Sequence, residues 1–448
     1  MLRKKIAALL MVACVGMMIA GCGSAGNNWR EEPPTLAITS ESEETQETSS
    51  EDQTQEEDDK EVVKADNMTT STIQVDPMDL KTACERAVFF ADWVYVDTKG
   101  NTIVSPLSLN IALGLAAEGA SGDTAKELYG YLGREDYADF VNDYMAFAEG
   151  LEQGYKEGDS SYYTFRYEIA NSLWINQKKR LIESYRSEME EKFRAEVAPV
   201  DFEVDIDGTL DKINGWCDEK THGMIPRIVE KQNIKANLEA ILINSVYFES
   251  PWAEEWHVRE GNFKNLNGET KTLDTLWGSA GSYFENDQAI AFSKRYYNGF
   301  EFIGILPKQE GEFSILGLDV ESLLKSRSND YLVSASMPKL NFSTTASKVE
   351  DILKSQGIQK PFDITAEFDK IIEEEQLFID QIIQKCKIEL DENGTKAAAV
   401  TAITLRANGL FVVDQETKEV ILDRPFAFMI YDSVNDEIVF IGKVTDVE

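Results

Sequence analysis

Cysteine and histidine are both scarce in this chain of 448 residues, which holds five cysteines and two histidines. Only Cys84, Cys217 and Cys386 lie beyond the N-terminal segment, and no two of them are spaced as CxxC. An odd number of cysteines without that spacing indicates neither a disulfide framework nor a zinc site. We therefore expect no bound metal and no other cofactor.

Motifs that mark common catalytic sites are missing as well. The chain has no G-x-S-x-G elbow, P-loop, H-E-x-x-H helix or dinucleotide fingerprint, and His222 and His257 belong to no such pattern. The carboxylates are too numerous to single out a catalytic pair. The sequence thus predicts a protein that is not an enzyme.

Positive charge is in short supply too. Lysine and arginine number 44 against 80 aspartates and glutamates, so the formal net charge is -36. Nucleic-acid phosphates would repel such a chain, and we expect no nucleic-acid partner. The hydrophobic share of 43% is enough for a sizeable core.

The first 21 residues have the pattern of a secretory signal. A basic stretch at residues 3–5 precedes an apolar run at residues 6–19 that is short for a membrane-spanning helix. The run ends in Ile19-Ala20-Gly21-Cys22, which resembles the lipobox of bacterial lipoproteins. The resemblance implies that Cys22 is lipidated and anchors the protein at the bacterial cell surface, as its only membrane contact. The alternative is an ordinary signal peptide with an incidental cysteine.

Residues 22–75 have a different composition from the rest of the chain. They are rich in Ser, Thr, Glu and Asp and nearly free of aromatic residues. Such a segment cannot bury enough apolar surface to offset the entropy cost of ordering it. We expect a disordered tether here, with an interaction tail as the alternative.

The folded domain is expected at residues 76–448. Asp76 is a suitable N-cap and Pro77 a suitable first residue for the opening helix, and Ser105 and Pro106 offer the same pair to a later helix. Apolar runs predict strands at residues 169–175, 240–248, 302–307 and 438–444.

The stretch from Asp391 to Gly409 organises the rest of the interpretation. After an acidic turn, it is a run of small residues without proline, in which Lys396 and Arg406 fall on the same parity. Period two is the repeat of a β-strand, so the uncharged face could enter a sheet. Alanine also favours helix, which is the alternative for the run by itself. The preceding residues 384–390 alternate as a half-buried strand and favour the strand interpretation.

A hinge motif and several supporting motifs then give the chain a family resemblance. The pattern E-x-G-T-x-A-A-A-x-T is carried by Glu392, Gly394, Thr395, Ala397, Ala398, Ala399 and Thr401. It resembles the hinge of inhibitory serpins, protease inhibitors that insert a cleaved loop into their own sheet. Similar motifs are N-x-x-x-S-P-x-S from Asn101, N-x-x-Y-F from Asn244 and D-R-P-F-A-F from Asp423, so the resemblance covers residues 76–448.

The resemblance implies both a fold and a function. The fold is α+β, with a large central, mainly antiparallel sheet, further sheets, about eight to nine helices and an exposed reactive loop within residues 391–422. The function is suicide-type inhibition of a serine protease, or also of a cysteine protease. The protease cleaves the loop and is trapped covalently as the loop inserts, and the inhibitor is expected to be a monomer. A non-inhibitory serpin that serves as a surface binding or adhesion module is the alternative.

Site residues follow by matching motifs. Ser105, Ser108, Asn244 and Gln384 correspond to the hydrogen-bonded shutter beneath the sheet, with glutamine where the family usually has histidine. Trp252 and Glu392 match residues near the point where insertion begins. Counting along the hinge places the scissile bond at Asn408-Gly409, with Arg406-Ala407 as the alternative. Further options, for chymotrypsin-like or elastase-like proteases, are Leu405, Ala402 and Ala407.

Overall fold

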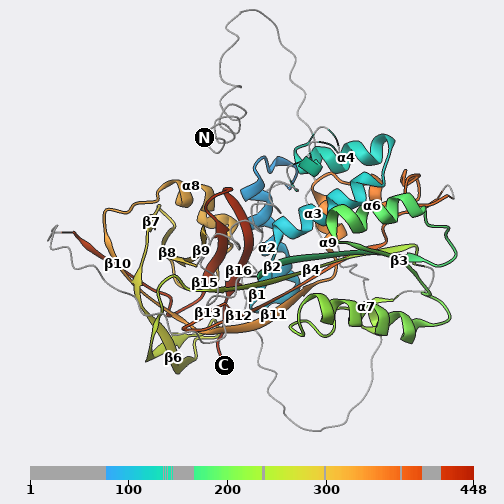
Figure 1. Cartoon of the computed structure of the whole chain (residues 1–448). Coiled ribbons are helices and arrows are strands. Elements are labelled where there is room, and N and C mark those ends of the chain that lie inside the picture. Colours follow the sequence, from blue (N-terminus) through green and yellow to red (C-terminus); the bar gives the residue numbers. More distant parts are fainter. Residues whose placement is uncertain are drawn as a thin grey trace, which may run out of the picture. The chain divides into compact units, whose positions relative to one another are not determined.

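Figure 1 shows the computed structural model, in which the described residues from Pro77 onward belong to one compact unit. The structure describes residues 77–134, 136, 138, 140–142, 144, 166–234, 238–296, 299–373, 376–395 and 415–448. The predicted signal peptide, Cys22 and the tether of residues 22–75 lie outside this set, as do loop residues 396–414.

The opening helix starts later than its sequence pattern predicts. Pro77–Asp79 forms a short 3-10 turn, η1, and helix α2 runs from Ala83 to Thr98. The Glu85 N–H donates to Thr82 Oγ1 at 3.0 Å, and the Thr82 N–H donates to the Glu85 carboxylate at 2.9 Å. This reciprocal capping box satisfies two backbone donors at the start of α2. The prediction of a helix from Pro77 was therefore wrong.

The second predicted cap is confirmed. Helix α3 (Pro106–Glu118) follows Ser105, whose Oγ accepts a hydrogen bond from the Ser108 N–H at 3.3 Å. The other helices of the described residues are α4 (Gly122–Leu132), α6 (Glu183–Phe193), α7 (Ile206–Lys220), α8 (Val320–Lys325) and α9 (Val349–Ser355), with 3-10 turns η2 (Lys231–Asn233), η4 (Leu316–Leu318) and η5 (Lys360–Phe362).

The largest sheet, here called the central sheet, has six strands. Their order is β11 (Leu340–Ala346), β12 (Gln381–Leu390), β13 (Gly394–Thr395), β4 (Ala240–Pro251), β2 (Arg166–Asn176) and β3 (Glu196–Val200). Neighbouring strands are antiparallel, except that β2 pairs with β3 in parallel and β12 also pairs directly with β4 in parallel.

Two smaller sheets complete the unit. One has the order β1 (Thr102–Val104), β16 (Glu437–Val444), β15 (Phe426–Asp432), β9 (Phe300–Pro307), β8 (Ala289–Arg295) and β7 (Tyr283–Glu285). The other has the order β14 (Thr417–Ile421), β10 (Leu332–Pro338), β6 (Thr270–Ala280) and β5 (His257–Lys264). Strands β2, β4, β9 and β16 cover the four runs predicted as strands, and the predicted α+β class with a central, mainly antiparallel sheet is confirmed.

Helices cover both faces of the central sheet. In Figure 1, α3 and α6 lie on one side of the long strands and α7 lies on the other. The α7 side is held by an apolar cluster that joins Ile213 of α7 to Trp174 of β2 and Ile243 of β4. No helix within the described ranges is both long and apolar enough to cross a membrane.

Candidate functional site

The central sheet is closed along part of its length and open at one end. Residues 381–385 of β12 pair directly with residues 241–245 of β4. Towards the other end the two strands separate, and β13 lies between them, with Thr395 paired to Leu390 on one side and Ser250 on the other. We call the line between β12 and β4 the slot; its open end holds the first residues of the predicted hinge.

Gly394 and Thr395 enter the slot in a defined way. Gly394 has a φ of 155°, in a region that other residues rarely adopt, so glycine allows the chain to turn into the sheet here. Thr395 is 2% exposed, and its hydroxyl shares a hydrogen bond of 2.7 Å with the hydroxyl of Tyr296. The Tyr296 ring stacks on Trp252 with centroids 4.1 Å apart. The predicted first residue of insertion is thus already inside the sheet.

The turn before the hinge is tied to the segment after β4. The Trp252 indole N–H donates to the Asp391 carbonyl at 2.8 Å, and the Trp252 backbone N–H donates to the Asn393 carbonyl at 3.0 Å. The Glu392 carboxylate forms an ion pair of 2.7 Å with Lys339, and this lysine holds the pKa of Glu392 below its usual value. Trp252 and Glu392 therefore lie together at the open end of the slot.

A buried hydrogen-bond network joins the strands at the closed part. Gln384 of β12 donates through Nε2 to Asn244 Oδ1 of β4 at 2.7 Å and to the Ser105 carbonyl at 2.8 Å, and its Oε1 accepts from the Ser105 N–H at 2.9 Å. Asn244 also donates to the hydroxyl of Ser108 and to Asn171 Oδ1 of β2. None of these five side chains is more than 1% exposed. The structure brings the four predicted shutter residues together.

The sequence interpretation did not assign three contact residues to the site. Asn171 was matched to the family's central-sheet entry but not to the shutter, although a polar residue in an apolar strand was a usable signal. Lys339 lies in the segment Pro338-Lys339-Leu340, which is similar to a P-K-F motif of serpins, but that motif does not predict its ion pair with Glu392. Tyr296 has no distinctive local pattern, because its contact with Thr395 joins positions 99 residues apart. Such contacts depend on the fold and not on local pattern.

A short segment crosses the outer face of the slot. Residues 222–228, here called the strap, follow α7. At one end His222 Nε2 lies 2.9 Å from a carboxylate oxygen of Glu168 on β2, and at the other end the Lys385 ammonium of β12 donates to the Arg227 carbonyl at 2.7 Å. At the first of these anchors, the His222 ring also packs on Tyr247 of β4, with ring centroids 4.9 Å apart. A strand that filled the slot would have to pass beneath the strap.

The remaining predicted site residues lie outside the described residues. They are Ala397, Ala398, Ala399, Thr401, Arg406, Ala407, Asn408 and Gly409. Their roles in the hinge and at the reactive bond stay predictions.

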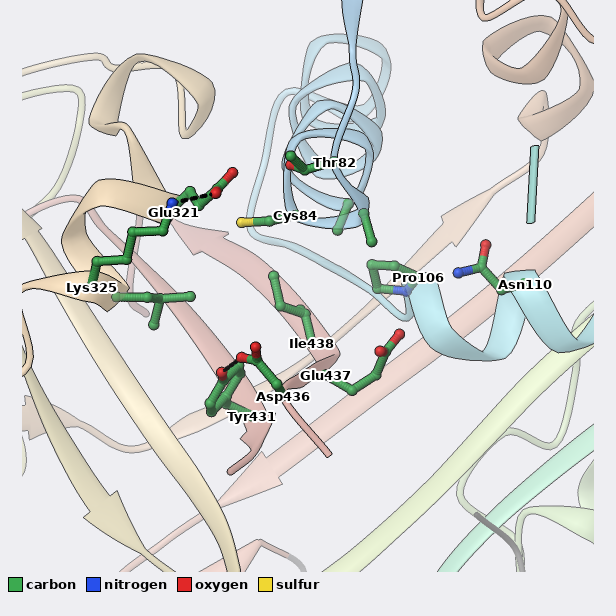
Figure 2. Close-up of a pocket in the computed structure, with 13 residues that line it drawn as sticks. Thr82, Cys84, Pro106, Asn110, Glu321, Lys325, Tyr431, Asp436, Glu437 and Ile438 are labelled. Carbon is green, nitrogen blue, oxygen red and sulfur yellow. Dashed lines mark hydrogen bonds and ion pairs between the residues drawn. The ribbon is translucent and has the colours of Figure 1, made fainter. Parts of the chain in front are cut away.

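A separate pocket of 330 Å³ lies on another sheet. Figure 2 shows it between α2, the start of α3, α8 and the β15–β16 hairpin, lined by Cys84, Glu321 and Glu437 among others. Burial raises the pKa of the Cys84 thiol to about 12, so that thiol stays protonated, and burial raises the pKa of Glu437 to about 7. Across the described part of the chain, no group of three or more His, Cys, Asp or Glu side chains could hold a metal ion.

Comparison with known proteins places this geometry in a family. Residues 89–447 match the family described as Serpin (serine protease inhibitor). A serpin-like protein of Thermococcus kodakarensis is 28% identical, over 97% of this chain and 98% of its own, and a protein of Cyanea capillata named serine protease inhibitor is 27% identical, over 80% and 95%. The crystal structure of tengpin, a thermophilic serpin in its native state, has 28% identity and a TM-score of 0.67, covering 82% of this chain and 95% of tengpin.

Proposed function

Because the chain belongs to the serpin family, we propose that it inhibits a serine protease by offering residues 391–422 as bait and inserting the cleaved loop into the central sheet. Serpins are generally protease inhibitors rather than enzymes, and they generally bind their target proteases. The observation that carries the proposal is β13, because the first residues of the loop already lie between β12 and β4.

The strands that flank β13 keep one register along the slot. Leu390 and Ser250 lie opposite each other across Thr395, and Gln384 lies opposite Asn244 where β12 and β4 pair directly, which is the same offset. If β12 and β4 moved apart sideways where they now pair directly, every residue of β12 would still face its present partner on β4. A loop that continued from Thr395 would meet both strands in register, without either strand sliding.

The same register assigns a face to each loop residue. Ala397 and Ala399 would follow Thr395 on the face of Leu390, Ile388 and Cys386, all buried side chains with at most 2% exposure. Small side chains suit that crowded face, because extra volume in a packed core is destabilising. Lys396 would fall on the opposite face, between Glu389 and Glu249. Opposite charges there would favour its entry.

The length of the slot constrains the bait bond. If the register continues, Thr404 would face Gln381, the first residue of β12, and Leu405 would face Ala240, the first residue of β4. Cleavage beyond Leu405 therefore frees a strand that fills the slot. Asn408-Gly409 and Arg406-Ala407 both satisfy this condition, whereas a cut after Ala402 would leave the far end of the slot empty.

The chemistry of inhibition divides between the two proteins. The protease serine attacks the scissile carbonyl and forms an ester with the new C-terminal residue, and the amine of the downstream segment leaves. Insertion then carries the esterified residue along the slot by about 35 Å, at roughly 3.3 Å for each residue. The protease is deformed before water hydrolyses the ester. This chain supplies the bait, the new strand and the energy of the added sheet pairing.

The test is to incubate the full mature chain with trypsin-like, elastase-like and subtilisin-like proteases. We expect a complex that survives SDS with at least one of them, and mass spectrometry of the released C-terminal fragment will identify the bond. Clean cleavage without any complex would overturn the inhibitory mechanism. That result would favour a non-inhibitory surface module.

We also propose that the inhibitor acts at the bacterial surface, held there by a lipid on Cys22. The support is the lipobox pattern at residues 19–22 and the acidic segment of residues 22–75 that follows it. Stable attachment needs more than one acyl chain, which bacterial lipoproteins carry. Cys22→Ser should move the protein from the membrane fraction to the medium; unchanged membrane association would refute the anchor.

A further inference from the structure

A groove near the open end of the slot takes no part in the mechanism above. It has a volume of 620 Å³ and is lined by His257 of β5, Trp277 of β6, Lys294 of β8, Leu332 of β10 and Thr417 of β14, together with Glu254 and Glu255 after β4. We call it the Trp277 groove. In Figure 1, β6 and β10 lie at the end of the unit away from α6 and β3.

The rims of the Trp277 groove connect to the two ends of the bait loop. On one rim, the N–H of Trp256, which follows Glu255, donates to the Glu392 carbonyl in the hinge turn at 3.3 Å. On the other rim, Thr417 pairs with Leu332 and lies three positions after residue 414. A protease bound to the loop between these ends would stand over this part of the molecule.

The floor of the groove exposes two large apolar side chains. Trp277 is 38% exposed and Leu332 is 53% exposed, and the strand register places both on the same face of their sheet. His257 and Arg259 of β5 flank the indole, with the His257 ring centroid 5.8 Å and the Arg259 guanidinium 5.1 Å from the Trp277 ring. A tryptophan held in place this way is a typical anchor for a protein partner.

Lys294 gives the groove a buried cation. It is only 4% exposed, its ammonium donates to the Ser279 carbonyl at 2.8 Å, and it lies 4.8 Å from the Trp256 ring centre. Among the described residues, no carboxylate lies within ion-pair distance of it. An ammonium has three donors, so Lys294 retains capacity for an oxygen from an incoming molecule. Glu254 and Glu255 are exposed at the rim and make it acidic.

We propose that the Trp277 groove is a second contact site for the target protease. An apolar side chain of the protease packs on Trp277 and Leu332, a carbonyl or carboxylate oxygen meets Lys294, and basic side chains of the protease face Glu254 and Glu255. This inference rests on the proposed inhibitory function.

The test compares association rates with the protease that forms the SDS-stable complex. Trp277→Ala and Leu332→Ser should each slow association about tenfold, as expected for anchor residues, while the stoichiometry of inhibition stays unchanged because insertion follows docking. Glu254→Gln with Glu255→Gln should slow association mainly at low salt. The matched control is Val204→Ser, because Val204 is 89% exposed and lies just before α7.

The outcomes separate this site from the function on which it rests. Unchanged association rates in folded variants would overturn the groove and leave inhibition intact. Faster association in Trp277→Ala would mean that the groove holds residues 396–414 of the chain itself, and would overturn the proposal too. If no protease forms a complex, the inhibitory function fails. Binding is then measured with a protease whose nucleophilic serine is replaced by alanine. If that protease does not bind either, the groove as a protease contact site is overturned as well. If the Trp277 and Leu332 variants misfold, the Glu254 and Glu255 replacements on the exposed segment still test the groove.

Discussion

Replacing Gln384 with leucine removes the side chain that joins β12, β4 and the start of α3. Leucine fills a similar volume but breaks the bonds to Asn244 Oδ1, the Ser105 carbonyl and the Ser105 N–H. Those partners are buried, and an unsatisfied buried polar group costs about 1–3 kcal/mol. Because Asn244 and Ser105 keep some of their other bonds, we expect a total loss of about 3–6 kcal/mol of stability.

That loss converts to a measurable change in melting temperature. A domain of about 370 residues unfolds with an entropy of about 0.8 kcal/mol/K, since each residue contributes about 2.1 cal/mol/K. The apparent melting temperature of Gln384→Leu should therefore fall by about 4–8 °C, measured by circular dichroism at one fixed scan rate.

Gln381→Leu is the matched control on the same strand. Gln381 lies three residues from Gln384 on the opposite face of β12 and donates one hydrogen bond, to the Ser347 carbonyl at 3.2 Å. Its Oε1 is buried and finds no partner among the described residues. Leucine there should therefore shift the melting temperature by no more than about 1–2 °C. Equal effects of the two replacements, or none from Gln384→Leu, would refute the role assigned to the network.

Three further predictions address the hinge and the pocket of Figure 2. Thr395→Arg should turn the inhibitor into a substrate, because a guanidinium cannot be buried beside Tyr296, whereas Thr395→Ser should still form the SDS-stable complex; a complex with the arginine variant would contradict the inward assignment. Tyr296→Phe leaves the buried Thr395 hydroxyl without its hydrogen-bond partner, so amide hydrogen exchange at residues 394–395 should become about 5- to 30-fold faster. An unchanged exchange rate would argue against a stabilising role for the hydrogen bond between Thr395 and Tyr296. Burial raises the pKa of Glu437 from 4.5 to about 7, so the stability gained from its bound proton is present below pH 4.5 and lost as the pH rises through 7. Glu437→Gln should therefore show a smaller decline of melting temperature with pH than the unchanged protein. Parallel plots of melting temperature against pH for the two proteins would rule out this role of Glu437.

The alternation of apolar and polar residues along the sequence predicted much of the fold, but what such a pattern can predict has a physical limit. The alternation at residues 384–390 correctly placed Gln384, Cys386, Ile388 and Leu390 on a buried face, because a strand with one face in the core must repeat every two residues. The same alternation cannot reveal which strand lies alongside. The sequence therefore predicted that Thr395 could enter a sheet but not that it already lies between β12 and β4.

Contacts between distant segments account for the other misses. The shutter residues were found only through resemblance, since Ser105 and Gln384 are 279 positions apart. Asn171 completes that network from β2, and a buried asparagine needs such partners. The misplaced helix start was a local error of a different kind: two capping signals stood six residues apart, and the reciprocal one at Thr82 prevailed over the Asp-Pro pair.

Two residues of the loop lie inside the slot, and chain length explains why the rest cannot follow while the loop is whole. Beyond Thr395 the direct pairing of β12 with β4 and the strap both stand in the way. If Leu405 reached Ala240, the chain would have to return along the whole slot, about 35 Å, to Thr417 of β14, which pairs with β10. The twelve residue steps from Leu405 to Thr417 span at most about 40–43 Å when fully extended. A connection of this length is too short to cover that distance and also pass around the edge of the sheet, so β14 would have to separate from β10. Cleavage of a bait bond between Leu405 and Thr417, where both proposed bonds lie, would remove this constraint at once.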